Sequence, residues 1–153
     1  MTTAPLASRP AFRIELSFDK PVVYDTGAGQ RAFFRVADSR LSGDRLQGRI
    51  ADDGGDWIVF RPDGTIETDS RMMIRAEDGT LVYWRSRGVI RGRPEQLADF
   101  KAGKEIDLSG AYYRSAPYFD APVGAHDWLT RSLFVGVGTF SVRGSVLDVH
   151  EIQ

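Results

Sequence analysis

The sequence contains no cysteine, and this absence removes several kinds of chemistry. Disulfide bonds, thiolate nucleophiles and cysteine-ligated metal sites are all excluded. Histidine is nearly absent as well, because the two histidines, His126 and His150, lie far apart and form no metal-ligand spacing with the scattered acidic residues. We therefore expect no bound metal and no other cofactor, so that any catalysis would use the side chains of the protein itself.

Two further absences bear on location and partners. No apolar run approaches the roughly 18 residues of a membrane span, and the first residues lack the basic start and apolar run of a signal peptide. Positive charge is not in excess, since 20 Lys and Arg residues face 21 Asp and Glu residues. Nucleic-acid binders usually carry a basic excess that neutralises phosphates. We therefore expect a cytoplasmic protein without membrane or nucleic-acid partners.

The composition is that of an ordinary globular protein. The chain has 153 residues, of which 42% are hydrophobic and 27% charged, which suits one domain with a real core. Residues 1–11 are expected to form a flexible tail and residues 12–153 a single domain. Sixteen glycines suit a turn-rich β protein, and short β-prone runs recur at the spacing of a barrel or sandwich.

One segment, residues 93–103 (RPEQLADFKAG), has the pattern of a short helix. Pro94 fits the first helical position and Gly103 is a typical stop. The expected fold class is therefore all-β, an antiparallel β-barrel of roughly eight to ten strands with one short helix.

The most informative stretch runs from residue 56 to residue 88. It reads as three antiparallel strands joined by two Asp-Gly turns, PDG at 62–64 and EDG at 77–79. A type I turn followed by a left-handed glycine sets the register. Trp57 then opposes Asp69 and Asp69 opposes Arg87, while the next pairs are Arg71 with Arg85 and Met73 with Tyr83.

Because side chains alternate with period two, this register divides the strands into two faces. One face is mainly apolar and carries Ile58, Phe60, Ile66, Thr68, Ser70, Met72, Ile74, Val82, Trp84 and Ser86. The other is charged and carries Trp57, Val59, Arg61, Glu67, Asp69, Arg71, Met73, Arg75, Tyr83, Arg85 and Arg87. Opposed arginines repel unless an anion lies between them, so the charged face is either a solvated outer surface or a binding site.

Several segments in order resemble the bacterial family catalogued as domain of unknown function 3237. They are GGDWIVFRPDGTIETDSRMMIRAEDGTLVYWRSRG, RPEQLADFKAG, AYYRSAPYFD and HDWLTRSLFVGVG, and they cover most of the chain after about residue 40. The family pattern has an aromatic residue where Met72 stands. The resemblance implies a small barrel with a ligand-holding interior, similar to allene oxide cyclase-like barrels, some of which are cyclases and isomerases that need no cofactor. It favours the charged face as the inner one.

The candidate site residues follow from that orientation. Asp69 and Arg87, with the phenol of Tyr83, are the expected catalytic groups, because a carboxylate held ionised by a guanidinium suits a base. We expect the substrate to contact Trp57, Arg71 and Arg85 inside the cavity, and Tyr113, Trp128 and Arg131 near its mouth. Each of these residues also has a purely structural interpretation as an ion-pair or packing residue.

Three functions remain open on the sequence. The first is a cofactor-independent isomerase, cyclase or lyase acting on a small organic carbonyl or acid compound. The second is a non-catalytic barrel that binds such a molecule, and the third is a structural partner with a solid apolar interior and the charged face outside. The adjacent pair His126-Asp127 is a weak hydrolase signal, since neighbouring loop residues rarely point together. A homodimer is compatible with each.

Overall fold

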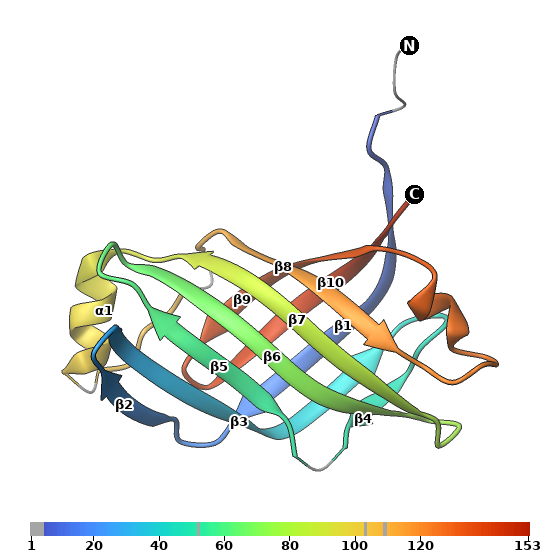
Figure 1. Cartoon of the computed structure of the whole chain (residues 1–153), viewed down its shortest axis with the longest axis horizontal. Helices are drawn as coiled ribbons and strands as arrows, with labels where there is room; N and C mark the ends of the chain where they lie inside the picture. Colours follow the sequence, from blue (N-terminus) through green and yellow to red (C-terminus); the bar gives the residue numbers. More distant parts are fainter. Residues whose placement is uncertain (1–4, 52, 103, 109) are drawn as a thin grey trace.

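The computed structural model describes residues 5–51, 53–102, 104–108 and 110–153. Its elements are a set of β-strands, one α-helix and one 3-10 helix (Figure 1). In chain order they are β1 (Ser8–Phe18), β2 (Val22–Thr26), β3 (Gly29–Ser42), β4 (Gly48–Ile50), β5 (Gly55–Phe60), β6 (Thr65–Ala76), β7 (Leu81–Arg91), α1 (Pro94–Lys101), β8 (Tyr113–Asp120), η1 (Asp127–Thr130), β9 (Phe134–Ser141) and β10 (Gly144–Ile152).

The strands close on themselves into an antiparallel barrel. Hydrogen-bonded neighbours follow the order β1, β10, β9, β8, β7, β6, β5 and β3, and β3 pairs back onto β1 through contacts such as Leu41 with Ile14. This ring has eight strands; β2 is an addition that pairs with β3, and the short β4 lies between β3 and β6, as β5 does further along the same strands. The expected all-β barrel with one short helix is confirmed. Within the described residues, the structure contains no helix that is long and apolar enough to cross a membrane.

One boundary differs from expectation. β1 begins at Ser8, which pairs with Ile152, so part of the expected tail belongs to the sheet; residues 1–4 lie outside the described residues. β8 runs continuously through Pro117. Proline is tolerated there because the pairing of β8 with β9 covers only Arg114 and Ser115, so the missing N–H is not required. The helix matches expectation, although Gly103 lies outside the described residues.

Both Asp-Gly turns have the predicted geometry. In the first turn the Gly64 N–H donates to the Arg61 carbonyl over 3.0 Å, and the Arg61 N–H donates to the Thr65 carbonyl over 2.9 Å. Gly64 and Gly79 have φ values of 85° and 86°, in the left-handed region that glycine adopts without strain. The register of β5, β6 and β7 is confirmed, with every predicted pair in place.

The orientation of the faces is the opposite of the expected one. Ile58, Met72 and Trp84 are buried in the barrel, whereas Trp57 is 45% exposed. The side chains of Arg71 and Arg87 are 52% and 74% exposed. The expectation that the charged face lines the interior is therefore wrong. The physical reason is the cost of desolvation, which is several kcal/mol for each buried ion even after relaxation, so the face with several arginines stays in water.

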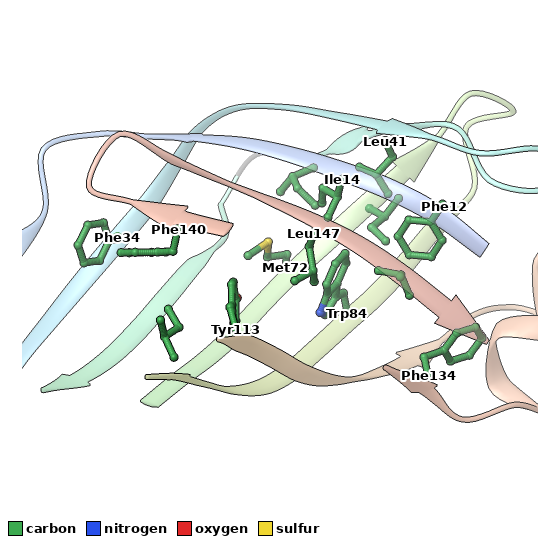
Figure 2. Packing of buried hydrophobic residues seen from close by; sticks show 14 of the residues in the cluster. Phe12, Ile14, Phe34, Leu41, Met72, Trp84, Tyr113, Phe134, Phe140 and Leu147 are labelled. Carbon is green, nitrogen blue, oxygen red and sulfur yellow. The ribbon is translucent and has the colours of Figure 1, made fainter. Parts of the chain in front are cut away.

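The interior is packed with aromatic and aliphatic side chains from all around the ring (Figure 2). Phe12, Trp84 and Phe119 meet edge to face, with ring centroids 5.6–6.0 Å apart. At the other end, Phe100 of α1 stacks on Phe60 with centroids 4.7 Å apart. Helix α1 thus closes one end of the barrel, as Figure 1 shows.

The two turns provide a matched pair for testing how far the barrel depends on them. Gly79→Ala would place a methyl group in open space. Its cost in folding free energy would come from the left-handed backbone alone and would be about 1 kcal/mol. Gly64→Ala would place a methyl group 2.5 Å from the carbonyl carbon of Arg93 at the start of α1. We expect Gly64→Ala to lower the free energy of unfolding by about 1–3 kcal/mol more than Gly79→Ala, measured by urea denaturation. Equal losses of unfolding free energy in the two variants would show that α1 can move away from the methyl group without loss of stability.

Candidate functional site

A group of polar side chains lies inside the barrel, between the two aromatic ends. Asp56, Ser70 and Ser86 are cross-strand neighbours on β5, β6 and β7, and all three are buried. The adjacent row on β6, β7 and β8 holds Thr68, Gly88 and Ser115. These residues are small, and the large side chains of the core pack in the same interior. We call this group, together with Tyr113 and the indole N–H of Trp84, the interior polar cluster.

Asp56 is the acidic member of the cluster. It is 2% exposed, and the hydroxyl of Ser70 donates a hydrogen bond to its Oδ1. Burial raises the pKa of Asp56 to about 6, because a carboxylate loses its hydration inside the barrel. The Ser70 hydrogen bond opposes this shift, and the nearby charge of Asp69 adds to it. The carboxyl group therefore exchanges its proton close to neutral pH.

Tyr113 is the phenolic member of the cluster. It lies at the start of β8 and points into the barrel, as Figure 2 shows. Burial raises the pKa of Tyr113, and the charge of Asp56 raises it further, which outweighs the hydroxyls of Thr68 and Ser145 that stabilise the phenolate. The phenol thus stays protonated and acts as a hydrogen-bond donor. Its ring fits because Gly138 on β9 has no side chain; a Cβ there would lie 2.9 Å from the ring.

Besides Oγ1 of Thr68, three further polar atoms of the cluster are buried without a hydrogen-bond partner among the described residues. They are Nε1 of Trp84, Oγ of Ser86 and Oγ of Ser115. Buried polar groups are almost always paired, since an unpaired donor or acceptor costs roughly 1–3 kcal/mol. Three such atoms beside Asp56 and Tyr113 suit a small polar molecule, or water that such a molecule would replace.

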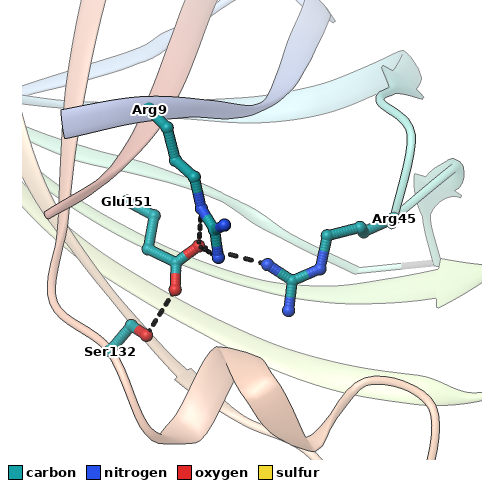
Figure 3. Close-up of polar contacts among 4 residues, drawn as sticks. All are labelled: Arg9, Arg45, Ser132 and Glu151. Carbon is teal, nitrogen blue, oxygen red and sulfur yellow. Dashed lines mark hydrogen bonds and ion pairs between the residues drawn. The ribbon is translucent and has the colours of Figure 1, made fainter. Parts of the chain in front are cut away.

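The two ends of the barrel are closed to different degrees. At the α1 end, Phe100 is the buried residue of the helix. At the opposite end, Leu46, Trp128 and Leu129 are buried. That end is also tied by ion pairs, since Glu151 accepts hydrogen bonds from Arg9, Arg45 and Ser132 over 2.9, 3.1 and 2.6 Å (Figure 3). The Ser132 hydrogen bond is the main reason why the pKa of Glu151 lies below its usual value. The α1 end is thus the less firmly closed one.

The residues predicted from the charged face lie together, but outside the barrel. Asp69 accepts a hydrogen bond from Arg71 Nη2 over 3.2 Å, and Arg87 Nε lies 4.0 Å from the same carboxylate. Trp57 is the cross-strand neighbour of Asp69. Tyr83 and Arg85 alternate outward on the same surface. A hollow of about 790 Å³ lies on this surface, and its lining includes Trp57, Asp69 and Arg87. Their predicted catalytic and binding roles stay predictions.

The three residues predicted near the mouth are separated from one another. Tyr113 belongs to the interior polar cluster, and Trp128 is buried at the closed end with the guanidinium of Arg45 3.6 Å from its ring centroid. Arg131 is exposed and pairs with Asp127. His126 does not pair with Asp127, since its Nε2 lies 2.8 Å from Oδ2 of Asp78 in the β6–β7 turn. The His126-Asp127 pairing considered for a hydrolase is therefore not formed.

The sequence reasoning missed Asp56, Ser70 and Ser86 as site residues. A signal was present, because Thr68, Ser70 and Ser86 interrupt an otherwise apolar face, and Asp56 continues that face by period two. Polar residues on a predicted core face mark a functional site or an error in the register. Among the described residues, no three His, Asp or Glu side chains gather in a way that could hold a metal ion.

Comparison with known proteins gives relatives over nearly the whole chain. A UPF0311 protein of Clostridium acetobutylicum is 29% identical over 144 residues, covering 93% of this chain and 91% of the relative. A UPF0311 protein of Rhodopseudomonas palustris is 28% identical over 128 residues and 84% of each chain.

Solved structures share the barrel. The crystal structure of a protein with unknown function from C. acetobutylicum matches with a TM-score of 0.89 at 24% identity, covering 99% of this chain and 100% of that one. A crystal structure described as an enzyme from Penicillium herquei matches with a TM-score of 0.73 at 16% identity, covering 100% and 98%. Both likenesses concern the fold alone. Residues 6–152 match the family described as Protein of unknown function (DUF3237), and the chain belongs to that family.

Proposed function

We propose that this protein is a cofactor-independent enzyme that moves a proton on a small organic carbonyl compound bound inside the barrel. The observation that carries the proposal is the buried carboxyl group of Asp56, whose pKa is about 6, beside unpartnered hydroxyl and indole groups. Carboxyl groups whose pKa is raised by burial are concentrated at functional sites. A general base works best when its pKa lies near the working pH.

The proposed roles follow from the protonation states of the two main groups. At neutral pH Asp56 is mainly ionised and takes a proton from the carbon next to a carbonyl, so that the C–H electron pair forms the C=C bond of an enolate. Tyr113 stays protonated and donates a hydrogen bond to the oxygen as negative charge develops on it. Asp56 then returns the proton to the same or another carbon, which gives exchange or isomerisation.

Ser86, Ser115 and Trp84 would complete the site by hydrogen bonding to the rest of the substrate. Access to the interior requires one end to open. We place the entrance at α1, because Phe100 is its buried residue, whereas the other end is held by buried Trp128 and Leu129 and by the ion pairs of Glu151. The helix would have to lift Phe100 from Phe60 to admit a ligand.

The alternative is a barrel that binds the same class of compound without turnover. The structural-partner hypothesis agrees with the outward charged face, but it offers no role for Asp56, Tyr113 and the unpartnered hydroxyls in the interior. Proton exchange separates the first two functions without knowledge of the natural substrate, because a general base beside a bound ketone exchanges its α-hydrogens with solvent.

Deuterium exchange into acetylacetone and phenylacetone in deuterium oxide, followed by proton NMR, tests the catalytic roles. We expect the native protein to accelerate exchange and Asp56→Asn to reduce the rate by about 100-fold or more, because removal of a general base has at least this effect. Tyr113→Phe should reduce it by about 100-fold through loss of the oxyanion donor. The matched outer-surface variant Asp69→Asn should lose far less activity than Asp56→Asn, because it removes only a neighbouring charge and leaves the base in place.

Other results would assign the function elsewhere. Loss of exchange in Asp69→Asn with native rates in Asp56→Asn would place the chemistry on the outer face. Saturable binding of these ketones to the native protein without exchange would leave a non-catalytic binder.

A stability measurement tests the burial of Asp56 independently of any substrate. Its pKa rises from 3.8 to about 6 on folding, so the native state holds the proton more tightly. The stabilisation that comes from this tighter proton binding is complete below about pH 4 and is lost as the pH rises through about 6. The change in the pKa of Asp56 is about two units, which corresponds to roughly 3 kcal/mol of folding free energy. We expect Asp56→Asn to raise the free energy of unfolding by up to about 3 kcal/mol near pH 8 and by little near pH 4.

Urea denaturation at several pH values provides the measurement, and Asp25→Asn on the exposed strand β2 is the control. The control should show no such growth of the difference with pH. An Asp56→Asn variant that is destabilised at every pH would mean that the carboxylate is satisfied as an ion and is not poised for proton transfer.

A further inference from the structure

The outer surface of β3 and β5 carries an aromatic pair in the open. Trp57 is 45% exposed, and the ring of Phe33 lies against it with centroids 4.6 Å apart. The Phe33 ring also covers the backbone of Gly55, where a Cβ would lie 2.5 Å from its Cε2. Large aromatic groups on a barrel exterior leave apolar area in water, and such exposure is typical of contact sites. We call Trp57 and Phe33 the aromatic platform.

A row of arginines runs along one side of this platform. Arg35, Gly55 and Arg71 are neighbours in one cross-strand row, and Arg85 continues it. Since neighbouring strands are about 4.8 Å apart, the Cα atoms of Arg35 and Arg71 are about 10 Å apart, and the Phe33 ring covers Gly55 between them. The two guanidinium groups therefore stand beside the aromatic platform, where they can reach the carboxylate of a ring stacked on it.

Hollows adjoin the platform on two sides. One, of about 220 Å³, has Phe33, Arg35 and Arg71 in its lining. The other, of about 410 Å³, is lined in part by Tyr24, Arg31 and Arg71. Trp57 lines both. In the second region Nη1 of Arg31 is buried and has no hydrogen-bond partner among the described residues, which provides an unused donor.

Positive charge is in excess around the platform. The carboxylate of Asp69 faces two guanidinium groups, those of Arg71 and Arg87. Among the described residues, the ion pair of Arg35 is a long contact of 3.5 Å with Asp53. Within the part of the chain that the structure describes, Arg85 forms no ion pair. A carboxylate ligand would complete this arrangement, because the guanidinium fork binds carboxylates with two parallel hydrogen bonds.

We infer that the aromatic platform is a second ligand site, separate from the interior, that binds a planar aromatic anion. The ring of the ligand stacks on Trp57, and its carboxylate lies between Arg71 and Arg35, with Arg31 within the adjoining hollow. A nucleic acid fits less well, because a polyanion needs a continuous basic track, and Glu67 and Asp69 interrupt the basic residues on this surface.

Titration with naphthoate, followed by proton–nitrogen correlation spectra of the three tryptophan indoles, tests the inference. Trp57 is exposed, whereas Trp84 and Trp128 are buried, so the three resonances distinguish the outer surface from the interior. We expect the Trp57 resonance to move and saturate while the other two stay. Arg71→Gln should weaken binding at least about tenfold, since a charge-assisted hydrogen bond contributes that much.

Matched controls separate the contributions to binding. Arg71→Lys keeps the charge but not the fork, and should recover only part of the affinity. Arg13→Gln removes an exposed, paired arginine on β1 and should leave binding unchanged. Naphthamide lacks the charge and cyclohexanecarboxylate lacks the aromatic ring, so both should bind at least about tenfold more weakly than naphthoate.

Three results would overturn the inference. They are no movement of the Trp57 resonance up to about 10 mM naphthoate, equal binding of naphthamide, and movement of the Trp84 resonance in its place. The last would mean that the anion enters the barrel. Because Asp56→Asn leaves the platform residues in place, its Trp57 resonance should still move and saturate with naphthoate, so failure of the interior proposal and failure of this one give different results.

Discussion

The backbone register set by the two Asp-Gly turns is the constraint on which the rest of the structure depends. Gly64 and Gly79 adopt left-handed conformations, and from there each strand alternates between the inside and the outside of a closed ring. A slip by one residue would bring Arg71 inside and place Ser70 in water. Since a buried unpaired guanidinium costs several kcal/mol, the charge pattern penalises the slipped barrel, and the turns and the arginines specify the same arrangement.

The local features of this fold could be predicted from the sequence, whereas the choice of inner face could not. Strands, turns and register depend on neighbours within one hairpin, and all pairs of β5, β6 and β7 were predicted. The inner face depends on how the sheet curves and closes. The family resemblance suggested a polar interior, and we assigned it to the face with the most charge. The interior is indeed polar in part, but through Asp56, Tyr113 and small hydroxyls.

Asp56 and Tyr113 were missed as partners for a related reason. They are 57 positions apart in the sequence, and each stands near the start of its strand, where no local pattern distinguishes it. They share one electrostatic environment only because β5 and β8 contribute to the same enclosed space. The burial of Trp84 could be predicted, because it lies on an apolar face. That its Nε1 would lack a hydrogen-bond partner could not be predicted, because this depends on contacts between distant strands.

The wall of the barrel is a single strand thick, and this has a thermodynamic consequence. Asp69 points outward, whereas its neighbours in the chain, Thr68 and Ser70, point into the barrel. The charge of Asp69 nevertheless contributes to the raised pKa of Asp56. Charge placed against the outer surface therefore changes the proton affinity of the inner carboxyl group. Linkage is reciprocal, so protonation of Asp56 changes the affinity of the outer surface for an anion by the same factor. The two surfaces of β5 and β6 are one coupled system, without any movement of the backbone.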